Sequence, residues 1–326
     1  MAVLLVFAVG ANAVAFMQAR RMTHFVDGGR RTAPPERLSA VEAAVVVLTG
    51  VTVPRPLNRR TPAQLGLMYR THRFPSGHGP ELEAWEVPGK AEQPLVLLFH
   101  GYAASKAALL TTARGLYGLG AGTLLVDFHG SGGSSGSGTT LGVREAQDVA
   151  AAVAFARRRW PQRRLVLYGF SMGGAAVLRA VAQDGLRPDG LVLEATFDSL
   201  LRTTRARVAS MGLPATPVAE LLLFWGGVQQ GFDPFRHTPA VFAGAVTCPV
   251  LQLQGAEDRR VSLDAARALH AAFTAPAELV VVPGVGHQAI ARTAPDAWRA
   301  AVAPFLAHIA TPHPGFLPQG GKGPLN

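Results

Sequence analysis

The sequence predicts an α/β protein in which helices cover both faces of a mostly parallel β-sheet. Short, almost continuously apolar segments, such as 95–99 and 250–254, alternate with longer segments of helical periodicity. Strands that are apolar throughout lie buried on both faces, which is typical of parallel sheets. Glycine-containing loops follow several of these strands, and reactive groups of open parallel sheets gather in such loops. We therefore expect one α/β domain at 67–310.

The elements expected within this domain follow in a regular order. The strand-like segments 68–74 and 82–87 flank a turn rich in proline and glycine, and this arrangement predicts an antiparallel hairpin at one edge of the sheet. Further strands are expected at 95–99, 123–127, 165–168, 191–194, 250–254 and 278–282. Helices are expected at 105–114, 143–159, 262–273 and 295–309, with another directly after Ser171.

The interval 198–245 breaks this alternation. It contains prolines and the apolar run 221–225 but no clear strand. We interpret it as a small helical lid inserted between two strands and apolar enough to face acyl chains. The alternative is that this interval only packs against the domain and does not act as a lid.

Composition excludes several classes of protein. The net charge of +10 comes almost wholly from arginine, and no basic block alternates with aromatic residues as in a nucleic-acid groove. The charge is compatible with an anionic lipid surface or simply with an arginine-rich proteome. Cys248 is the only cysteine, so neither an internal disulfide nor a cysteine metal cluster can form.

The N-terminal segment predicts a membrane anchor at 1–22. Residues 2–19 are apolar except for Asn12 and Gln18, and two arginines follow. As a helix this segment is ~27 Å long, close to the ~30 Å thickness of a bilayer core. A cleaved secretory signal and a buried core helix are the alternatives, and the side of the membrane is open.

Two further segments flank the domain. The collar, residues 23–66, contains a capping box at Ser39 and Glu42 that predicts a short helix through Leu48. We expect it to lie either against the bilayer or against the α/β domain. The tail at 311–326 is rich in proline and glycine and is expected to be disordered.

A nucleophile elbow is predicted at Ser171. The apolar run 165–168 leads into a G-x-S-x-G pattern, and a helix of small residues starts at once. Gly169 and Gly173 lack side chains that would clash where strand and helix fold together. Ser171 is expected at a strained backbone angle, with the Met172 N–H directed at a developing oxyanion.

Two later loops supply an acid and a histidine in the required order. Asp258 follows strand 250–254, and His287 follows strand 278–282 between glycine-containing turns. The chain order Ser171, Asp258, His287 matches the scheme in which histidine is the general base and aspartate orients it. Glu194 is a rival acid at the end of the preceding strand, whereas Glu257 is expected to project elsewhere.

The loop after strand 95–99 predicts the second oxyanion donor. It reads His100-Gly101-Tyr102, and Gly101 lets the chain turn close to the nucleophile. We expect the Tyr102 N–H to serve beside that of Met172, and His100 to form hydrogen bonds within the loop. The glycine-rich loop 127–134 lacks the lysine of a phosphate-binding loop, so we do not expect a nucleotide site there.

Together these motifs resemble the α/β-hydrolase superfamily over roughly 67–309. The resemblance is greatest to the serine aminopeptidase-like and monoacylglycerol-lipase-like branch, some members of which carry an N-terminal membrane anchor. One position departs from the pattern, because many relatives have arginine where His129 stands in the loop 127–134. This departure concerns the anchoring of the loop and leaves the triad intact.

The resemblance implies a serine hydrolase that needs no cofactor or metal. The expected substrate is a small acyl ester, possibly lipid-like in character, with thioesters and small amides as further options. The alternatives are a membrane-tethered aminopeptidase-like hydrolase and a non-catalytic binding protein on the same fold. An intact set of Ser171, Asp258 and His287 favours the enzyme. The motifs leave the oligomeric state open.

Overall fold

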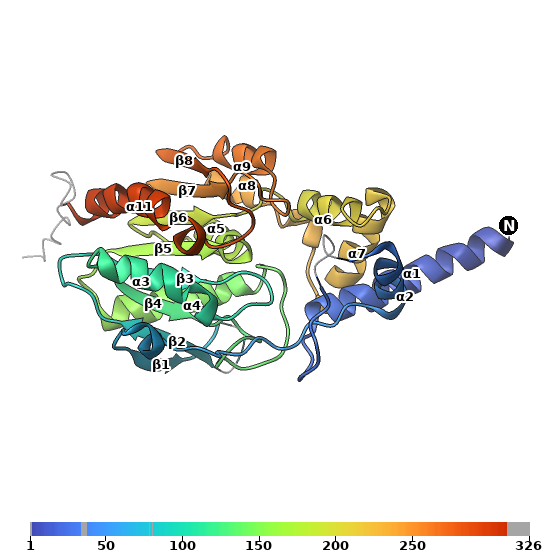
Figure 1. Cartoon of the computed structure of the whole chain (residues 1–326), viewed down its shortest axis with the longest axis horizontal. Coiled ribbons are helices and arrows are strands. Elements are labelled where there is room, and N and C mark those ends of the chain that lie inside the picture. The colour runs from blue at the N-terminus through green and yellow to red at the C-terminus, as the bar shows by residue number, and fades with distance from the viewer. Residues whose placement is uncertain (1, 34–37, 78, 80, 312–326) are drawn as a thin grey trace, which may run out of the picture.

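The computed structural model describes residues 2–33, 38–77, 79 and 81–311. Its centre is an eight-stranded sheet with the order β1-β2-β4-β3-β5-β6-β7-β8 (Figure 1). The strands are β1 (Arg70–Phe74), β2 (Leu82–Val87), β3 (Leu95–Phe99), β4 (Gly122–Val126), β5 (Leu165–Phe170), β6 (Gly190–Glu194), β7 (Val250–Gly255) and β8 (Ala277–Val282). Strand β2 is antiparallel to both β1 and β4, and the other pairings are parallel. The predicted fold class is therefore confirmed.

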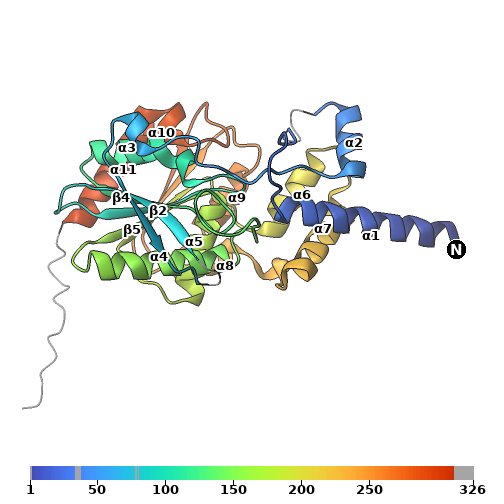
Figure 2. The same cartoon turned by 90° about the horizontal axis from the view of Figure 1, so that it is seen from below.

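Helices cover both faces of this sheet (Figure 2). One face carries α4 (Glu145–Arg159), α5 (Met172–Gln183), α8 (Pro239–Ala243) and α9 (Leu263–His270). The other carries α3 (Leu110–Gly118), α10 (Ile290–Thr293) and α11 (Pro295–Ala310). The helix expected at 105–114 begins instead with a 3₁₀ turn, η3 (Lys106–Leu109), before α3.

Alternate residues of the central strands explain why these strands are apolar throughout. Leu97 and Leu167 pack into the core on the α4/α5 side, whereas Leu98 and Tyr168 pack into the core on the α3/α11 side. All four are fully buried. Because both faces are covered, no position of these strands is left for a polar side chain facing water.

The parallel register brings the loops at one edge of the sheet together. Phe99 at the end of β3 pairs with Gly169 near the end of β5, and Phe170 pairs with Glu194 at the end of β6. The loops that follow β3, β5 and β6 therefore start side by side, as expected at the carboxyl ends of parallel strands.

The interval between β6 and β7 is helical, as expected. It contains α6 (Leu200–Ala209), α7 (Ala215–Gln230), η4 (Pro234–Arg236) and α8, which we call the inserted helices. In both views α6 and α7 stand beyond the end of the sheet, next to α1 (Ala2–Thr23) and α2 (Ala40–Thr49) (Figures 1 and 2). Their action as a lid stays a prediction.

The prediction of a membrane anchor at 1–22 is wrong. Among the residues that the structure describes, no helix has both the length and the apolar character that crossing a membrane requires. The C-terminal half of α1 lies instead along α7, where Ala15 and Ala19 are buried. The Trp225 indole donates a hydrogen bond to Asn12 Oδ1 over 3.0 Å, and its ring meets that of Phe16 edge to face.

Polar side chains of α1 explain this outcome. Gln18 Nε2 donates to the carbonyl oxygens of Val46 and Val47 at the end of α2, over 2.6 and 2.9 Å. Asn12 and Gln18, which interrupt the apolar segment, thus have protein partners on α7 and α2. Apolar composition alone does not distinguish a helix packed against protein from one packed against lipid.

The collar packs against the α/β domain. Its helix α2 has the expected capping box between Ser39 and Glu42. After α2, a 3₁₀ turn, η2 (Pro62–Leu65), precedes β1. Phe25 and Val53 form a small apolar cluster with Ala103 of the loop after β3. The predicted disordered tail lies, from residue 312 onward, outside the described residues, as do His78 and Pro80 of the hairpin turn.

Candidate active site

The loops after β5, β7 and β8 bring Ser171, Asp258 and His287 together. His287 Nε2 lies 3.1 Å from Ser171 Oγ, and His287 Nδ1 lies 2.7 Å from Asp258 Oδ2. The imidazole therefore bridges a hydroxyl and a carboxylate with its two nitrogens. This is the geometry that a nucleophile, a general base and an orienting acid require. Their catalytic roles stay predictions.

The turn at Ser171 has the strained backbone expected of an elbow. Ser171 has φ 53° and ψ −116°, a conformation that L-residues rarely adopt, and α5 starts at the next residue. A Cβ at Gly169 would lie 2.4 Å from Gly174 Cα, and one at Gly173 would lie 2.3 Å from the Phe99 carbonyl oxygen. Glycine is thus required at both positions for the strand and helix to approach.

Backbone amides fix the carboxylate of Asp258. Its Oδ1 accepts hydrogen bonds from the N–H groups of Arg260 and Val261 over 2.8 and 3.0 Å. Only 6% of Asp258 is exposed, so Oδ2 is held toward His287 in a site with little water. The neighbouring Glu257 is exposed, as expected.

The rival acid Glu194 lies one strand away and has different partners. Its Oε1 accepts a hydrogen bond from the Ile290 N–H over 2.5 Å, and its other oxygen accepts one from the Tyr168 hydroxyl. Trp298 Nε1 donates to the same hydroxyl over 3.1 Å. Burial raises the pKa of Glu194 to about 7, although the bonds from Ile290 and Tyr168 act to lower it. Glu194 therefore ties the segment after His287 to the sheet without meeting the imidazole.

The two expected oxyanion donors flank the same turn. Tyr102 follows β3 and Met172 opens α5, directly after Ser171. Within the described part of the chain, neither backbone N–H donates to another backbone group. Their role as oxyanion donors stays a prediction. The Tyr102 side chain reaches away, and its hydroxyl donates to the Met22 carbonyl oxygen over 2.7 Å.

His100 forms hydrogen bonds within its loop, as expected. The Phe128 N–H donates to Nε2 over 3.1 Å, so the proton lies on Nδ1, 2.9 Å from the Gly101 carbonyl oxygen. Burial lowers the pKa of His100. A neutral, fully occupied imidazole is suited to shaping the loop and not to acting as the base. Gly101 itself lies against the Phe170 ring.

A buried ion-pair cluster joins the loop after β3 to the loop after β4. The Lys106 ammonium, which is fully buried, meets Asp127 and lies 2.8 Å from Glu83. Asp127 also accepts from the backbone N–H groups of Lys106 and Gly133 over 2.7 and 2.8 Å. One carboxylate thus links the loop after β3 to the glycine-rich loop after β4. No sequence pattern predicted this cluster, although Lys106 is one of only three lysines in the chain.

Arg55 of the collar anchors the glycine-rich loop. Its guanidinium donates to the carbonyl oxygens of Gly132, Ser134 and Gly136 over 3.0, 2.6 and 3.0 Å. Arg55, from a distant part of the chain, thus anchors the loop in which His129 stands where many relatives have arginine. His129 itself is partly buried, and burial lowers its pKa. Nothing in the local sequence around Arg55 indicated this role.

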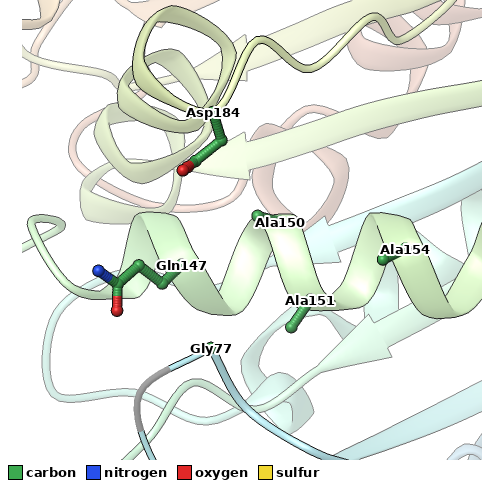
Figure 3. A pocket seen from close by; sticks show the side chains of 6 residues that line it. All are labelled: Gly77, Gln147, Ala150, Ala151, Ala154 and Asp184. Atoms are coloured by element: carbon green, nitrogen blue, oxygen red, sulfur yellow. The ribbon is translucent and has the colours of Figure 1, made fainter.

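Two other features of the described residues lie apart from this arrangement or do not form. Among the described residues, no group of three or more His, Cys, Asp or Glu side chains could hold a metal ion. A depression of about 430 Å³ lies over α4, and its lining contains none of the three triad residues. It is formed by Gly77, Gln147, Ala150, Ala151, Ala154 and Asp184 (Figure 3).

Comparisons with known proteins identify the family and the fold. Residues 90–223 match the family model described as serine aminopeptidase, S33, and residues 230–317 match that of TAP-like protein. An uncharacterized protein of Mycobacterium tuberculosis (strain H37Rv) is 31% identical over 219 residues, which are 64% of this chain and 69% of the relative. The α/β-hydrolase domain-containing protein WAV2 of Arabidopsis thaliana is 28% identical over 67% of this chain and 70% of its own.

Solved structures show the same fold. The esterase Pf2001 of Pyrococcus furiosus superposes with a TM-score of 0.66 at 20% identity, over 86% of this chain and 99% of the esterase. An esterase of Exiguobacterium antarcticum gives a TM-score of 0.56 at 16% identity, over 73% of this chain and all of its own. The sheet, the family models and these relatives lead to one assignment: the chain belongs to the α/β-hydrolase superfamily.

Proposed function

We propose that the protein is a serine hydrolase that cleaves carboxylic esters through an acyl-enzyme on Ser171. The observation that carries this proposal is the pair of contacts made by His287, to Ser171 on one side and Asp258 on the other. Membership of the superfamily and the fold shared with esterases support it. Thioesters and small amides react by the same steps and are further substrates of this class.

The proposed reaction starts with attack of Ser171 Oγ on the ester carbonyl carbon. His287 Nε2 takes the hydroxyl proton, and Asp258 stabilises the imidazolium through Nδ1–H. The carbonyl oxygen becomes an oxyanion beside the N–H groups of Tyr102 and Met172. A single donor of this kind contributes roughly 10²–10³ in kcat in well-studied serine hydrolases.

The second half of the proposed reaction regenerates Ser171. His287 delivers its proton to the leaving alcohol oxygen as the carbon–oxygen bond breaks, which leaves the acyl group on Oγ. A water molecule then attacks the acyl carbon, and Nε2 takes its proton. The same nitrogen returns a proton to Oγ when the carboxylic acid leaves.

An ester is a better substrate for this site than a peptide with a free amino terminus. Capture of a free ammonium group calls for an unengaged carboxylate beside the nucleophile. The acids at the ends of β6 and β7 are occupied, because Glu194 binds Ile290 and Tyr168 and Asp258 binds His287. This observation supports the proposal of an esterase over that of an aminopeptidase-like hydrolase.

Hydrolysis of p-nitrophenyl butyrate by purified wild type and Ser171→Ala tests the proposal. We expect the variant to lose on the order of 10⁴-fold or more in kcat, because members of a triad act as a unit. Ser210→Ala is the matched control, since Ser210 is an exposed serine at the end of α6 and should leave the rate unchanged. Undiminished turnover by folded Ser171→Ala would refute the assignment.

A further inference from the structure

The chain around the end of α1 contacts the loop after β3, which carries one of the two expected oxyanion donors. The Tyr102 hydroxyl donates to the Met22 carbonyl oxygen over 2.7 Å, and Arg31 Nη1 donates to the Ala103 carbonyl oxygen over 3.0 Å. The partners of these two bonds are 80 and 72 residues apart in the sequence. The segment 22–32 therefore holds two consecutive residues of this loop.

The backbone at Ala103 requires support from its surroundings. Its φ is 50°, in the left-handed region that a residue with a Cβ rarely adopts. Such a conformation persists where the surrounding structure maintains it. Arg31 binds the carbonyl oxygen of this residue, and Ala103 packs with Phe25 and Val53 in a small apolar cluster. The segment 22–32 thus supports the loop at the residue where its backbone is strained.

The backbone N–H of Tyr102 lies between two fixed points. It shares one planar peptide unit with the Gly101 carbonyl, whose oxygen lies 2.9 Å from His100 Nδ1. His100 therefore holds this peptide unit from the side of β3. On the other side, the Tyr102 hydroxyl is bound to Met22, and the centroid of its ring lies 6.5 Å from that of the Phe25 ring. The direction of the N–H thus depends on His100 and on the segment 22–32 together.

Both ends of the segment 22–32 are bound to other parts of the chain. At one end, the Thr139 N–H donates to the Thr23 carbonyl oxygen over 2.9 Å. At the other end, the Thr32 N–H donates to the Thr52 carbonyl oxygen over 3.0 Å, and the Thr52 N–H donates to Thr32 Oγ1 over 2.7 Å. Each of the two residues that contact the loop after β3 adjoins one of these bound ends. Their positions are therefore fixed before any substrate binds.

The Tyr102 hydroxyl stays a hydrogen-bond donor across the neutral pH range. Burial raises the pKa of Tyr102 to about 12, although the positive charges of Arg31 and Arg207 act to lower it. A phenol that keeps its proton can donate to a carbonyl oxygen, which only accepts. The bond to Met22 is therefore present wherever an esterase is assayed.

We propose that Arg31 and the bond between Tyr102 and Met22 position the oxyanion donor of the loop after β3. This inference rests on the proposed esterase function and adds positioning residues from the N-terminal part of the chain. Arg31 acts through Ala103 and touches no reacting atom, so it is a positioning residue. The end of α1 and the start of the collar then serve the stabilisation of the transition state.

Arg31→Met and Tyr102→Phe test this proposal through kcat and KM for p-nitrophenyl butyrate. Each variant removes one hydrogen bond to the segment or from it and leaves the Tyr102 backbone N–H in place. We expect kcat per active site to fall about tenfold, because loss of a whole oxyanion donor costs roughly 10²–10³ and a misdirected donor costs less. KM should stay within about twofold, because the donor acts on charge that develops in the transition state.

Inhibition by a trifluoromethyl ketone separates positioning from stability. Ser171 Oγ adds to the carbonyl carbon of the ketone, His287 Nε2 takes the hydroxyl proton, and the oxyanion that forms needs the same donors as the transition state. The Ki of the ketone should rise in each variant by the factor by which kcat/KM falls. Titration with a fluorophosphonate counts the active sites, and thermal unfolding measures the stability of each variant.

Arg30→Met and Tyr117→Phe are the matched controls. Arg30 is exposed and its replacement removes the same charge, and Tyr117 of α3 is 49% exposed and its replacement removes the same hydroxyl. Both should leave kcat and Ki unchanged. Arg31→Lys keeps a donor that can reach Ala103 and should recover part of the rate that Arg31→Met loses.

The outcomes distinguish the positioning role from the proposed function. If Arg31→Met and Tyr102→Phe have the kcat per active site and the Ki of their controls, the positioning role is refuted while the esterase stands. A lower melting temperature with unchanged Ki would equally refute it, because the contacts would then stabilise the fold alone. If the wild type neither hydrolyses an ester nor binds the ketone, the proposed function itself fails.

Discussion

The ends of β6 and β7 each bury a carboxylate, and the two carboxylates have different partners. Asp258, after β7, binds the His287 imidazole and two backbone amides. Glu194, at the end of β6, binds a phenol and the backbone amide of Ile290, three residues beyond His287. Burial therefore does not distinguish the acid of the proposed triad. The proposed acid is the carboxylate that contacts the imidazole, whereas the other carboxylate binds the segment that follows His287.

Asp258→Asn is expected to have the largest effect of the changes that distinguish the two carboxylates. The amide would donate to Nδ1, so the proton of His287 would lie on Nε2, which could then no longer accept the Ser171 proton. We expect kcat for p-nitrophenyl butyrate to fall about 10⁴-fold with the fold intact. A rate within tenfold of wild type, combined with an inactive Glu194→Gln, would reverse the two roles.

Glu194→Gln should act on stability and its pH dependence. The folded pKa of about 7 exceeds the ordinary 4.5, so the folded state binds more protons between these values. The stabilising contribution is thus present below about pH 4.5 and is lost as the pH rises to about 7, by on the order of 3 kcal/mol. Because the amide does not titrate, the variant should lack this loss.

Urea unfolding of both proteins between pH 4.5 and 8 measures this difference. The loss of an acceptor for the Tyr168 hydroxyl lowers the stability of the variant equally at every pH, so only the pH-dependent part reports the titration. Asp148, whose pKa burial also raises to about 7, is present in both proteins and cancels in the comparison. Parallel curves would show that Glu194 does not titrate in this range.

Arg55→Gln should have a smaller effect, in a region that contains neither carboxylate. Three carbonyl oxygens of the loop after β4 lose their donor, and we expect a loss of about 1–3 kcal/mol in unfolding free energy. Thermal unfolding measures it. Arg59→Gln, an exposed arginine of the same collar, is the control. Equal melting temperatures for the two variants would contradict the anchoring role.

Glu257→Gln should have the smallest effect. Glu257 adjoins Asp258 in sequence but its side chain is exposed. We expect kcat/KM to stay within about twofold of wild type, since solvent screens the charge. A loss of a hundredfold or more would mean that the loop presents its acids in another order.

The sequence was informative where local chain geometry decides the structure. A strand, a tight turn and a helix around Ser171 can be recognised within about ten residues, and the loops of Asp258 and His287 follow from the strand alternation. The central strands could be predicted because strands buried on both faces are apolar throughout, whereas β1 and β2 were predicted from the turn between them. The helical character of 198–245 followed from the lack of a strand pattern.

Contacts between residues far apart in the chain could not be predicted from the sequence. Arg55 anchors a loop about 80 residues away, and no pattern in the sequence around it indicates this contact. The segment 2–19 was wrongly predicted to be a membrane anchor because an apolar helix can pack against protein as well as against lipid. Asn12 and Gln18 were the visible signals of protein partners, and only the packing of α7 and α2 identifies those partners.

Covalent labelling with a fluorophosphonate tests the central claim, that Ser171 is the nucleophile activated by His287 and Asp258. The reagent reacts with an activated serine hydroxyl and mimics the tetrahedral stage of the reaction. After labelling of the full chain, peptide mass spectrometry should locate one adduct on Ser171. Labelling should be lost in Ser171→Ala and strongly slowed in Asp258→Asn. An adduct on another serine, or no adduct on folded wild type, would contradict the account.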